Sequence, residues 1–166
     1  MQRLKRDFFE RPTLDVAEDL IGKTLVFHDV RAVITETEAY IGEEDPACHA
    51  ACGKTKRNAV MYEKAGLTYV YLIYGMYYCL NFVTERENFP AAVLIRSVMI
   101  NGVDDKKLNG PGKLCRFLGI TKEHNGIDLI TNNEFFVIDT GLSFRIQKTP
   151  RIGISAAKDR LWRFTV

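Results

Sequence analysis

Twenty consecutive residues, 65–84, carry no charge, and this stretch limits the fold more than any other part of the chain. Its length would suffice for a membrane-spanning helix. However, it holds five of the seven tyrosines, and tyrosine favours the membrane interface over the middle of a span. Aromatic and β-branched residues on both sides of Gly75 are typical of two buried strands joined by a tight turn. We therefore predict a β-hairpin from residues 67–74 and 77–83, and no membrane as a partner.

The remaining patterns are short and mix helices with strands. Residues 13–21 have a helical apolar stripe, with Thr13 as the expected cap and Gly22 as the expected stop. Strands and helices do not alternate regularly, and 166 residues suit one domain, so we predict a single α+β domain over residues 1–166. The other expected elements are a second helix at 112–118 and strands at 24–28, 31–41, 91–99, 127–130, 135–138 and 143–146, with a loop at 42–58.

The N-terminus and the cysteines bear on compartment and cofactors. No apolar segment of a signal peptide follows Met1, so we expect the protein not to be secreted and its four cysteines to be free thiols. The run Cys48-His49-x-x-Cys52 suggests zinc, but a closed zinc site usually has two such pairs and a second is missing. We therefore expect neither a metal nor another cofactor.

The net charge of +2 combines two unlike parts. Residues 1–45 hold 6 basic and 11 acidic side chains, whereas residues 46–166 hold 17 and 10. The small net charge argues against a nucleic-acid-binding protein, but the basic part, residues 46–166, could contact phosphate groups. The turn 109–113 adds glycines and a lysine at a helix start, where free N–H groups favour anions. The phosphate-contact candidates are Lys54, Arg57, Gly110, Gly112 and Lys113.

The strand at 31–41 carries the candidate acid–base group. A period of two places Glu36, Glu38 and Tyr40 on one face. For Glu36 we expect a solvent-exposed position. Glu38 lies close in sequence to Tyr40 and to a loop that ends at His49, and burial near such groups can tune the pKa of a carboxylate. Spacing alone leaves a structural role for Glu38 open.

The tyrosines of the hairpin divide into two groups. Core packing is the simpler interpretation for Tyr69, Tyr77 and Tyr78. Tyr74 precedes Gly75 at the expected tip, where a side chain is poorly placed for the core and well placed to enter a base stack. Tyr71 could face the same pocket as Tyr40, and two such rings would hold a flat base between them.

Taken in order, these segments resemble the alkyladenine (3-methyladenine) DNA glycosylase family over nearly the whole chain. The blocks Glu36-Thr37-Glu38-Ala39-Tyr40 and Tyr71-x-x-Tyr74-Gly75-Met76-Tyr77 are the most specific. The other matching segments are Phe8 to Gly22, Asp45 to His49, Arg57-Asn58, Ala92 to Arg96, Asn109 to Cys115 and Pro150 to Gly153. Where the family usually has a longer helical segment after Arg96, this chain has only residues 97–108.

The resemblance implies a role for each matched residue. Glu38 would be the general base that activates water, and Arg96 would help position that water. The flipped base would be held by Tyr40, His49, Tyr71, Asn81 and Leu94. Among these, Asn81 would disfavour the amino group of guanine, and outside the pocket Tyr74 would enter the duplex where the base departed. No lysine falls at a matched pocket position, which favours direct hydrolysis over a Schiff base.

The resemblance also implies a fold and an activity. The fold would be a curved, mostly antiparallel sheet with a protruding hairpin and short surrounding helices. The activity would be release of damaged purines from double-stranded DNA, which leaves an abasic site for a downstream abasic-site endonuclease. We expect a monomer, cytoplasmic and nucleoid-associated in a bacterium or nuclear in a eukaryote. The alternatives are a non-catalytic lesion-sensing module of the same fold, which would not need Glu38, and a small-molecule enzyme that binds phosphate at residues 109–113.

Overall fold

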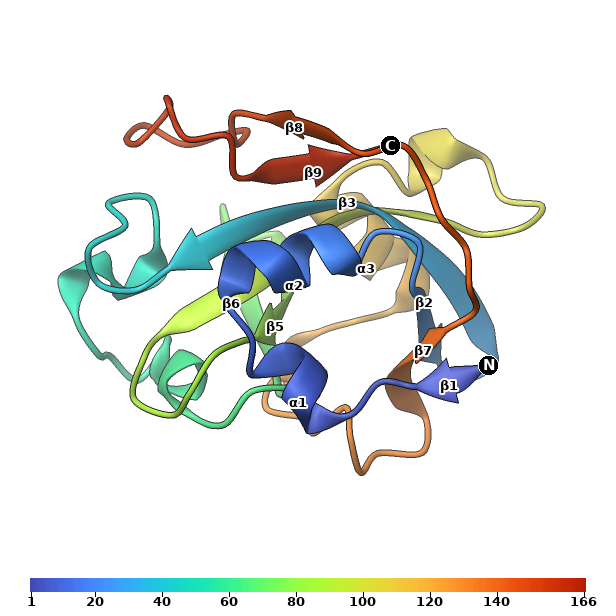
Figure 1. The fold of residues 1–166 in the computed structure, drawn as a ribbon, viewed down its shortest axis with the longest axis horizontal. Coiled ribbons are helices and arrows are strands. Elements are labelled where there is room, and N and C mark those ends of the chain that lie inside the picture. Colours follow the sequence, from blue (N-terminus) through green and yellow to red (C-terminus); the bar gives the residue numbers. More distant parts are fainter.

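The computed structural model describes residues 1–166, and the long strand β3 (Val30–Ile41) organises its sheet. Strand β6 (Ala91–Met99) pairs with one edge of β3 along most of its length. The other edge is shared by β2 (Thr24–Phe27) at the start and β9 (Arg163–Thr165) further on. The register of β3 against β6 shifts on both sides of Glu36, and such bulges bend a strand. The sheet therefore curves along β3 (Figure 1).

The complete sheet has nine strands, and every pairing is antiparallel. Its main order is β1-β7-β2-β3-β6-β5-β4, and β8 joins through β9. The predicted α+β class with a curved antiparallel sheet is confirmed. The bounds of the outer strands are Gln2–Arg3 for β1, Phe135–Asp139 for β7 and Gln147–Thr149 for β8.

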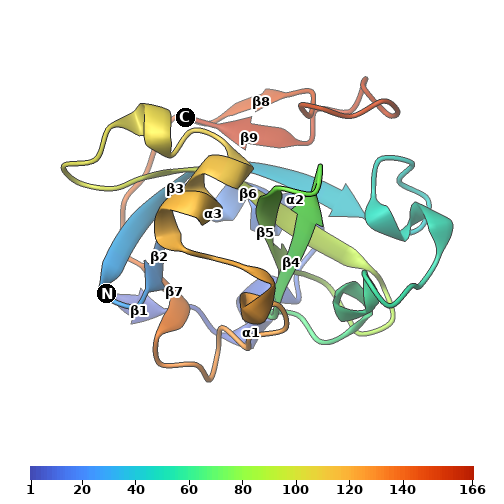
Figure 2. The ribbon, with the colours of Figure 1, turned by 180° about the vertical axis from the view of Figure 1, so that it is seen from behind.

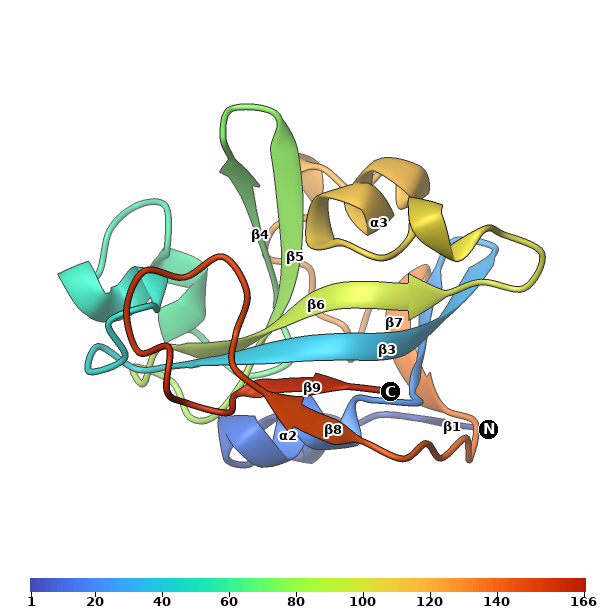
Figure 3. The same ribbon diagram turned by 90° about the horizontal axis from the view of Figure 1, so that it is seen from above.

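The uncharged stretch forms the predicted hairpin, from β4 (Thr68–Ile73) and β5 (Tyr77–Val83). The backbone N–H of Met76 closes the turn on Ile73. Tyr74 and Gly75 have positive φ angles of 53° and 65°, which suit tight hairpin turns but strain a tyrosine. Figure 3 shows the hairpin projecting from the sheet beside α3.

Helices cover both faces of the sheet. Helices α1 (Arg6–Phe9) and α2 (Thr13–Asp19) lie on one face, and α3 (Pro111–Leu118) lies on the other (Figures 1–3). A core of 25 buried residues joins these layers. None of the helices is both long enough and apolar enough to cross a bilayer.

The prediction that Thr13 caps a helix over 13–21 is wrong in two respects. Pro12 is the N-cap residue, and the helix ends at Asp19. The hydroxyl of Thr13 is instead bonded to Thr84 and Glu85 beyond β5, so a tertiary contact takes the place of the cap. The helix at 112–118 is confirmed, and it begins one residue earlier because Pro111 occupies its first turn.

Two predicted C-terminal strands are also wrong. Residues 127–130 form turns with one isolated bridge from Asp128 to Leu67, and residues 143–146 contain no strand. The short strands β8 and β9 were missed, because they are held by pairing with each other and with β3 rather than by a local pattern. The region 42–58, predicted as a loop, includes a short 3-10 helix at His49–Cys52.

A smaller core of eight buried residues lies under that loop and the base of the hairpin. Two further 3-10 turns, Asp105–Lys107 and Lys122–His124, connect the flanks of α3, and one at Ala59–Tyr62 leads into β4. Tyr40 and Tyr71 pack against this smaller core. The loop, the hairpin and β3 thus meet at one place, which is where the cavity opens.

Candidate active site

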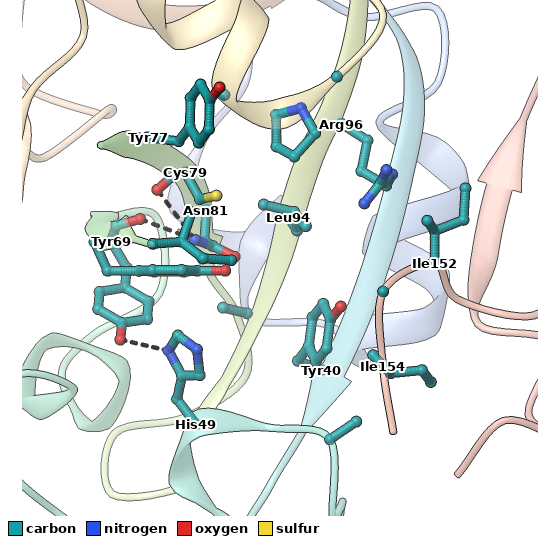
Figure 4. A pocket seen from close by; sticks show the side chains of 18 of the residues that line it. Tyr40, His49, Tyr69, Tyr77, Cys79, Asn81, Leu94, Arg96, Ile152 and Ile154 are labelled. Carbon is teal, nitrogen blue, oxygen red and sulfur yellow. Dashed lines mark hydrogen bonds between the residues drawn. The ribbon is translucent and has the colours of Figure 1, made fainter. Parts of the chain in front are cut away.

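A cavity of about 460 Å³ lies between the hairpin, β3, β6 and the start of α3. Figure 4 shows Tyr40 on one side and His49 with Tyr69 on the other, with Leu94 between them and Arg96 on the side of Tyr40 and Ile152. Most of the lining is hydrophobic, and a few polar groups converge on it, as in sites for small organic ligands. The predicted pocket residues it brings together are Tyr40, His49, Tyr71, Asn81, Leu94 and Arg96.

Glu38 lies beneath the wall formed by Tyr40, Arg96 and Ile152, and its side chain is fully buried. The Tyr40 hydroxyl donates to its carboxylate at 2.9 Å, and the Ile152 backbone N–H donates at 2.6 Å. Burial raises the pKa of Glu38, while Arg96, Ile152 and Tyr40 oppose that rise. The result is a desolvated carboxylate that keeps three donors, an arrangement able to accept a proton.

Arg96 connects Glu38 to a second carboxylate. Its Nη1 lies 3.5 Å from Glu38, and its Nε donates to Glu36 at 2.7 Å. Arg163 on β9 donates to the other oxygen of Glu36 at 2.6 Å. The prediction that Glu36 is solvent-exposed is therefore wrong, since two arginines distant in sequence enclose it.

The aromatic wall combines a histidine with tyrosines from β4. The ring of His49 meets Tyr71 edge to face, with centroids 4.3 Å apart, and its Nδ1 lies 2.9 Å from the Tyr69 hydroxyl. Burial and the charge of Arg57 lower the pKa of His49, so its imidazole is held neutral. The prediction that Tyr71 faces the same pocket as Tyr40 is confirmed, because both line the cavity.

Asn81 and Leu94 pair across β5 and β6, and both are buried and line the cavity. The amide nitrogen of Asn81 donates to the carbonyl oxygens of Tyr69 at 3.1 Å and Cys79 at 3.4 Å. These bonds fix the side chain, so its position in the lining is set by the hairpin backbone.

The tip of the hairpin exposes a group of large side chains. Tyr74 is 81% exposed, as predicted, and Met76 beside it is 66% exposed. The prediction that Tyr77 packs in the core is wrong: it is 40% exposed and lines the cavity. A Cβ at Gly112 would lie 3.0 Å from Tyr77, so a glycine there lets α3 approach the hairpin. Tyr69 is buried as predicted, and Tyr78 packs against the main core.

Of the predicted phosphate contacts, some line the cavity and others lie outside its lining. Gly110, Gly112 and Lys113 line it, so a lysine does reach the cavity lining. The Lys113 ammonium is bonded to Asn109 at 3.0 Å. Arg57 donates to the Leu72 carbonyl of the hairpin at 2.7 Å. Lys54 is outside the lining, with its ammonium 5.4 Å from the centre of the Tyr62 ring.

Sequence reasoning missed the backbone donor of Ile152 and the buried pair of Asp45 and Arg151. Arg151 donates through both terminal nitrogens to Asp45, at 2.7 and 2.9 Å, and both side chains are fully buried. Asp45 and Arg151 both fall in segments that match the family, and this match was the signal that could have pointed to them. A main-chain donor has no side-chain signature in a sequence.

The four cysteines are free thiols, and no group of three or more histidine, cysteine, aspartate or glutamate side chains is placed to hold a metal ion. Cys48 is buried with its pKa raised to about 11 by burial, whereas Cys52 is exposed.

A cavity of this size, lined mostly by hydrophobic and aromatic side chains and close to a buried carboxylate, is typical of a site for a small organic ligand. Comparison with known proteins identifies the family. The sequence profile of Methylpurine-DNA glycosylase (MPG) matches residues 7–166, and the chain belongs to this family.

Bacterial relatives match over nearly their full length. A protein of Rickettsia felis is 60% identical over 98% of this chain and 92% of its own length. One of Ehrlichia ruminantium is 54% identical over 98% and 88%, and one of Sodalis glossinidius is 57% identical over 97% and 95%. Each of the three is named "Putative 3-methyladenine DNA glycosylase".

Proposed function

We propose that this protein is a monofunctional DNA glycosylase that excises 3-methyladenine and other alkylated or deaminated purines from duplex DNA. The observation that carries the proposal is the fully buried Glu38 carboxylate beneath an aromatic cavity, with three donors directed at it. An enzyme that acts on a base must take it out of the stack, and the cavity offers a place for it.

Each wall of the cavity has a part in the mechanism. The flipped purine stacks against Tyr40 and Tyr71, and aromatic rings bind a cationic alkylpurine well. His49, held neutral, contributes an uncharged edge, and Asn81 opposes an exocyclic amino group.

The reaction itself is a hydrolysis. The Glu38 carboxylate accepts a proton from a water molecule oriented with Arg96, and the water oxygen forms a bond to C1′ of the sugar. The N-glycosidic bond breaks, and its electron pair leaves with the purine, which is a good leaving group when alkylated. The products are the free base and an abasic site, and no group of the protein becomes covalently bound.

Analysis of the products tests this proposal. Methylated duplex DNA treated with the protein in the presence of a chelator should release 3-methyladenine, seen by chromatography, and leave abasic sites in unbroken strands. Borohydride should trap no protein–DNA adduct, although Lys113 lines the cavity. A trapped adduct would indicate a Schiff-base lyase, and DNA binding without base release would indicate the lesion-sensing module.

The pH dependence of excision follows from the burial of Glu38. Because burial raises its pKa above that of an ordinary glutamate, about 4.3, the base is protonated and inactive at a higher pH than an exposed glutamate would be. We expect the single-turnover rate to fall, as pH decreases, with a midpoint above that value. A rate that stays constant down to pH 4 in the folded protein would contradict this assignment.

Replacing Tyr74 with alanine should weaken lesion capture more than nonspecific binding. Stacking of one base on an aromatic side chain contributes about 1–3 kcal/mol, so affinity for a lesion duplex should fall by about 5- to 150-fold. Fluorescence anisotropy in the Glu38→Gln background measures binding without cleavage. Leu142→Ala, at an exposed position outside the cavity lining, is the control. Equal losses on damaged and undamaged duplexes would show that Tyr74 has no role in capture.

The proposal extends to partners and location. The protein acts as a monomer on double-stranded DNA, in association with the nucleoid of a bacterial cytoplasm, since the relatives above are bacterial. Its product is an abasic site, so an abasic-site endonuclease must act next.

A further inference from the structure

Asp45 and Arg151 form an ion pair in which both side chains are fully buried, outside the cavity lining. Asp45 also accepts from the backbone N–H groups of Ile41 and Ala47, each at 3.1 Å. Its carboxylate therefore ties together the end of β3 and the loop that leads to His49. Burying two charges is unfavourable unless geometry compensates, and this pair has a bidentate fork and further backbone donors.

Arg151 also contacts residues next to Glu38 on β3. Its Nη1 donates at 3.0 Å to the carbonyl of Ala39, the residue after Glu38. Its guanidinium lies 4.8 Å from the centre of the Tyr40 ring and 4.9 Å from that of Trp162. The residue after Arg151 is Ile152, whose N–H donates to Glu38 at 2.6 Å.

Two of the three donors on Glu38 are thus in direct contact with the pair or adjacent to it in sequence. Ile152 lies in the segment between β8 and β9, which passes beside β3 (Figure 3). Figure 4 places the side chains of Ile152 and Tyr40 on the same side of the cavity. Outside the strands, this segment makes two backbone hydrogen bonds, Arg160 to Ala157 and Ala39 to Trp162, and neither involves residues 150–154. Beside the site it is therefore anchored by the bonds of Arg151 to Asp45 and Ala39, and Arg160 lies 3.7 Å from the same Asp45 carboxylate.

We propose that the Asp45–Arg151 pair is a positioning unit, which holds the Ile152 N–H and the Tyr40 ring against Glu38 and so keeps the carboxylate ionised and correctly oriented. This inference rests on the proposed function, because it concerns the same carboxylate. Neither residue of the pair touches the cavity, so both act through Ile152 and Tyr40.

The charges around Glu38 determine which variants give a clean test. The titratable and charged groups around it come from four strands and two loops. They are Glu36 and Tyr40 on β3, Cys79 on β5, Arg96 on β6, Arg163 on β9 through Glu36, and, in the two loops, Asp45 with Arg151 and with Arg160 at 3.7 Å. Removing either member of the pair would add an unpaired charge near Glu38. Arg151→Lys and Asp45→Glu keep every charge and disturb only the geometry.

The decisive readout is the ionisation of Glu38. When the Ile152 donor is displaced, the carboxylate loses a hydrogen bond that favours its charged form, so the pKa of Glu38 should rise in both variants by about one pH unit. The carbon-13 signal of the Glu38 carboxyl, assigned by its loss in Glu38→Gln, reports this without any activity. In single-turnover excision, the pH at which the rate falls to half on acidification should rise by the same amount. The maximal rate should fall, while the protein concentration that gives half-saturation stays unchanged.

Lys148→Gln is the matched control, because it removes the surface ion pair between Lys148 on β8 and Glu18 on α2. It should leave both the pH dependence of excision and its maximal rate unchanged. If folded Arg151→Lys and Asp45→Glu both keep the wild-type Glu38 titration and lose only thermal stability, the pair is purely structural and the proposal is wrong. If the wild type releases no base, the carbon-13 titration still decides the positioning question, and only the proposed function fails.

Discussion

Glu38→Gln is expected to lower the single-turnover rate of base excision by about 10²- to 10⁴-fold, the usual contribution of a positioned general base. The amide has nearly the same shape but only one acceptor oxygen, so it keeps the donors on one side and loses those on the other. Because residue 38 does not line the cavity, the cavity should keep its shape. The amide cannot take a proton from water at neutral pH. The substitution therefore removes the chemical step and leaves the binding surface unchanged.

Two measurements separate these effects. Excision under single-turnover conditions reports the chemical step. Anisotropy with a lesion-containing duplex reports capture. The dissociation constant should stay within about threefold of the wild type, which corresponds to a change in binding free energy of under about 0.7 kcal/mol. Glu18→Gln, at a surface ion pair far from the cavity, should have the wild-type rate. A Glu38→Gln protein that excises at a tenth of the wild-type rate or faster would show that another group activates the water.

Asp45→Ala is expected to destabilise the protein by about 3–5 kcal/mol, as is typical when one partner of a buried ion pair is removed. The substitution would leave the Arg151 guanidinium buried without its partner, and its Nε already lacks one. Two backbone N–H groups, of Ile41 and Ala47, would also lose their acceptor. Urea denaturation measures the loss as a lower transition midpoint.

Asp19→Ala provides the comparison, since Asp19 pairs with Arg11 on the surface and such pairs contribute only about 0–1 kcal/mol. The pH dependence has a defined sign. The fold lowers the pKa of Asp45, so its stabilisation is complete above the ordinary aspartate value of about 3.9 and is lost as pH falls through the lowered folded-state value. A loss below about 1 kcal/mol for Asp45→Ala would contradict the importance of the pair.

The local patterns predicted the centre of the fold well. Period-two alternation placed Glu38 and Tyr40 on one face of β3, where they share a hydrogen bond, and the turn at Gly75 predicted a hairpin with Tyr74 exposed. Each of these features depends on neighbours within a few residues. The same holds for α3, which follows the turn at 109–112 and begins one residue before the predicted start.

Features that depend on distant partners could not be predicted in this way. Glu36 has the spacing of an exposed residue, but Arg96 and Arg163 reach it from other strands. Tyr77 has the aromatic character of a core residue, but Gly112 of α3 lies beside it and leaves it facing the cavity. The N–H of Ile152 is invisible in any side-chain pattern.

The overall charge also has a different meaning in the folded protein. The excess of acidic residues before residue 46 includes Glu36, Glu38 and Asp45, all of which are enclosed by arginines from later in the chain. Much of the acidic excess therefore belongs to the interior. Of the basic residues, Lys113 lines the cavity, and Arg57 lies over the ring of Tyr71, which also lines it.

The most direct test of the central claim is chromatographic measurement of the bases released from one methylated duplex by the wild type and by Glu38→Gln. The wild type should release 3-methyladenine in an amount equal to the abasic sites formed, and the variant should release almost none while it still binds the duplex. Equal release by the two proteins, or no release by a folded wild type that binds the DNA, would contradict a mechanism in which Glu38 activates water.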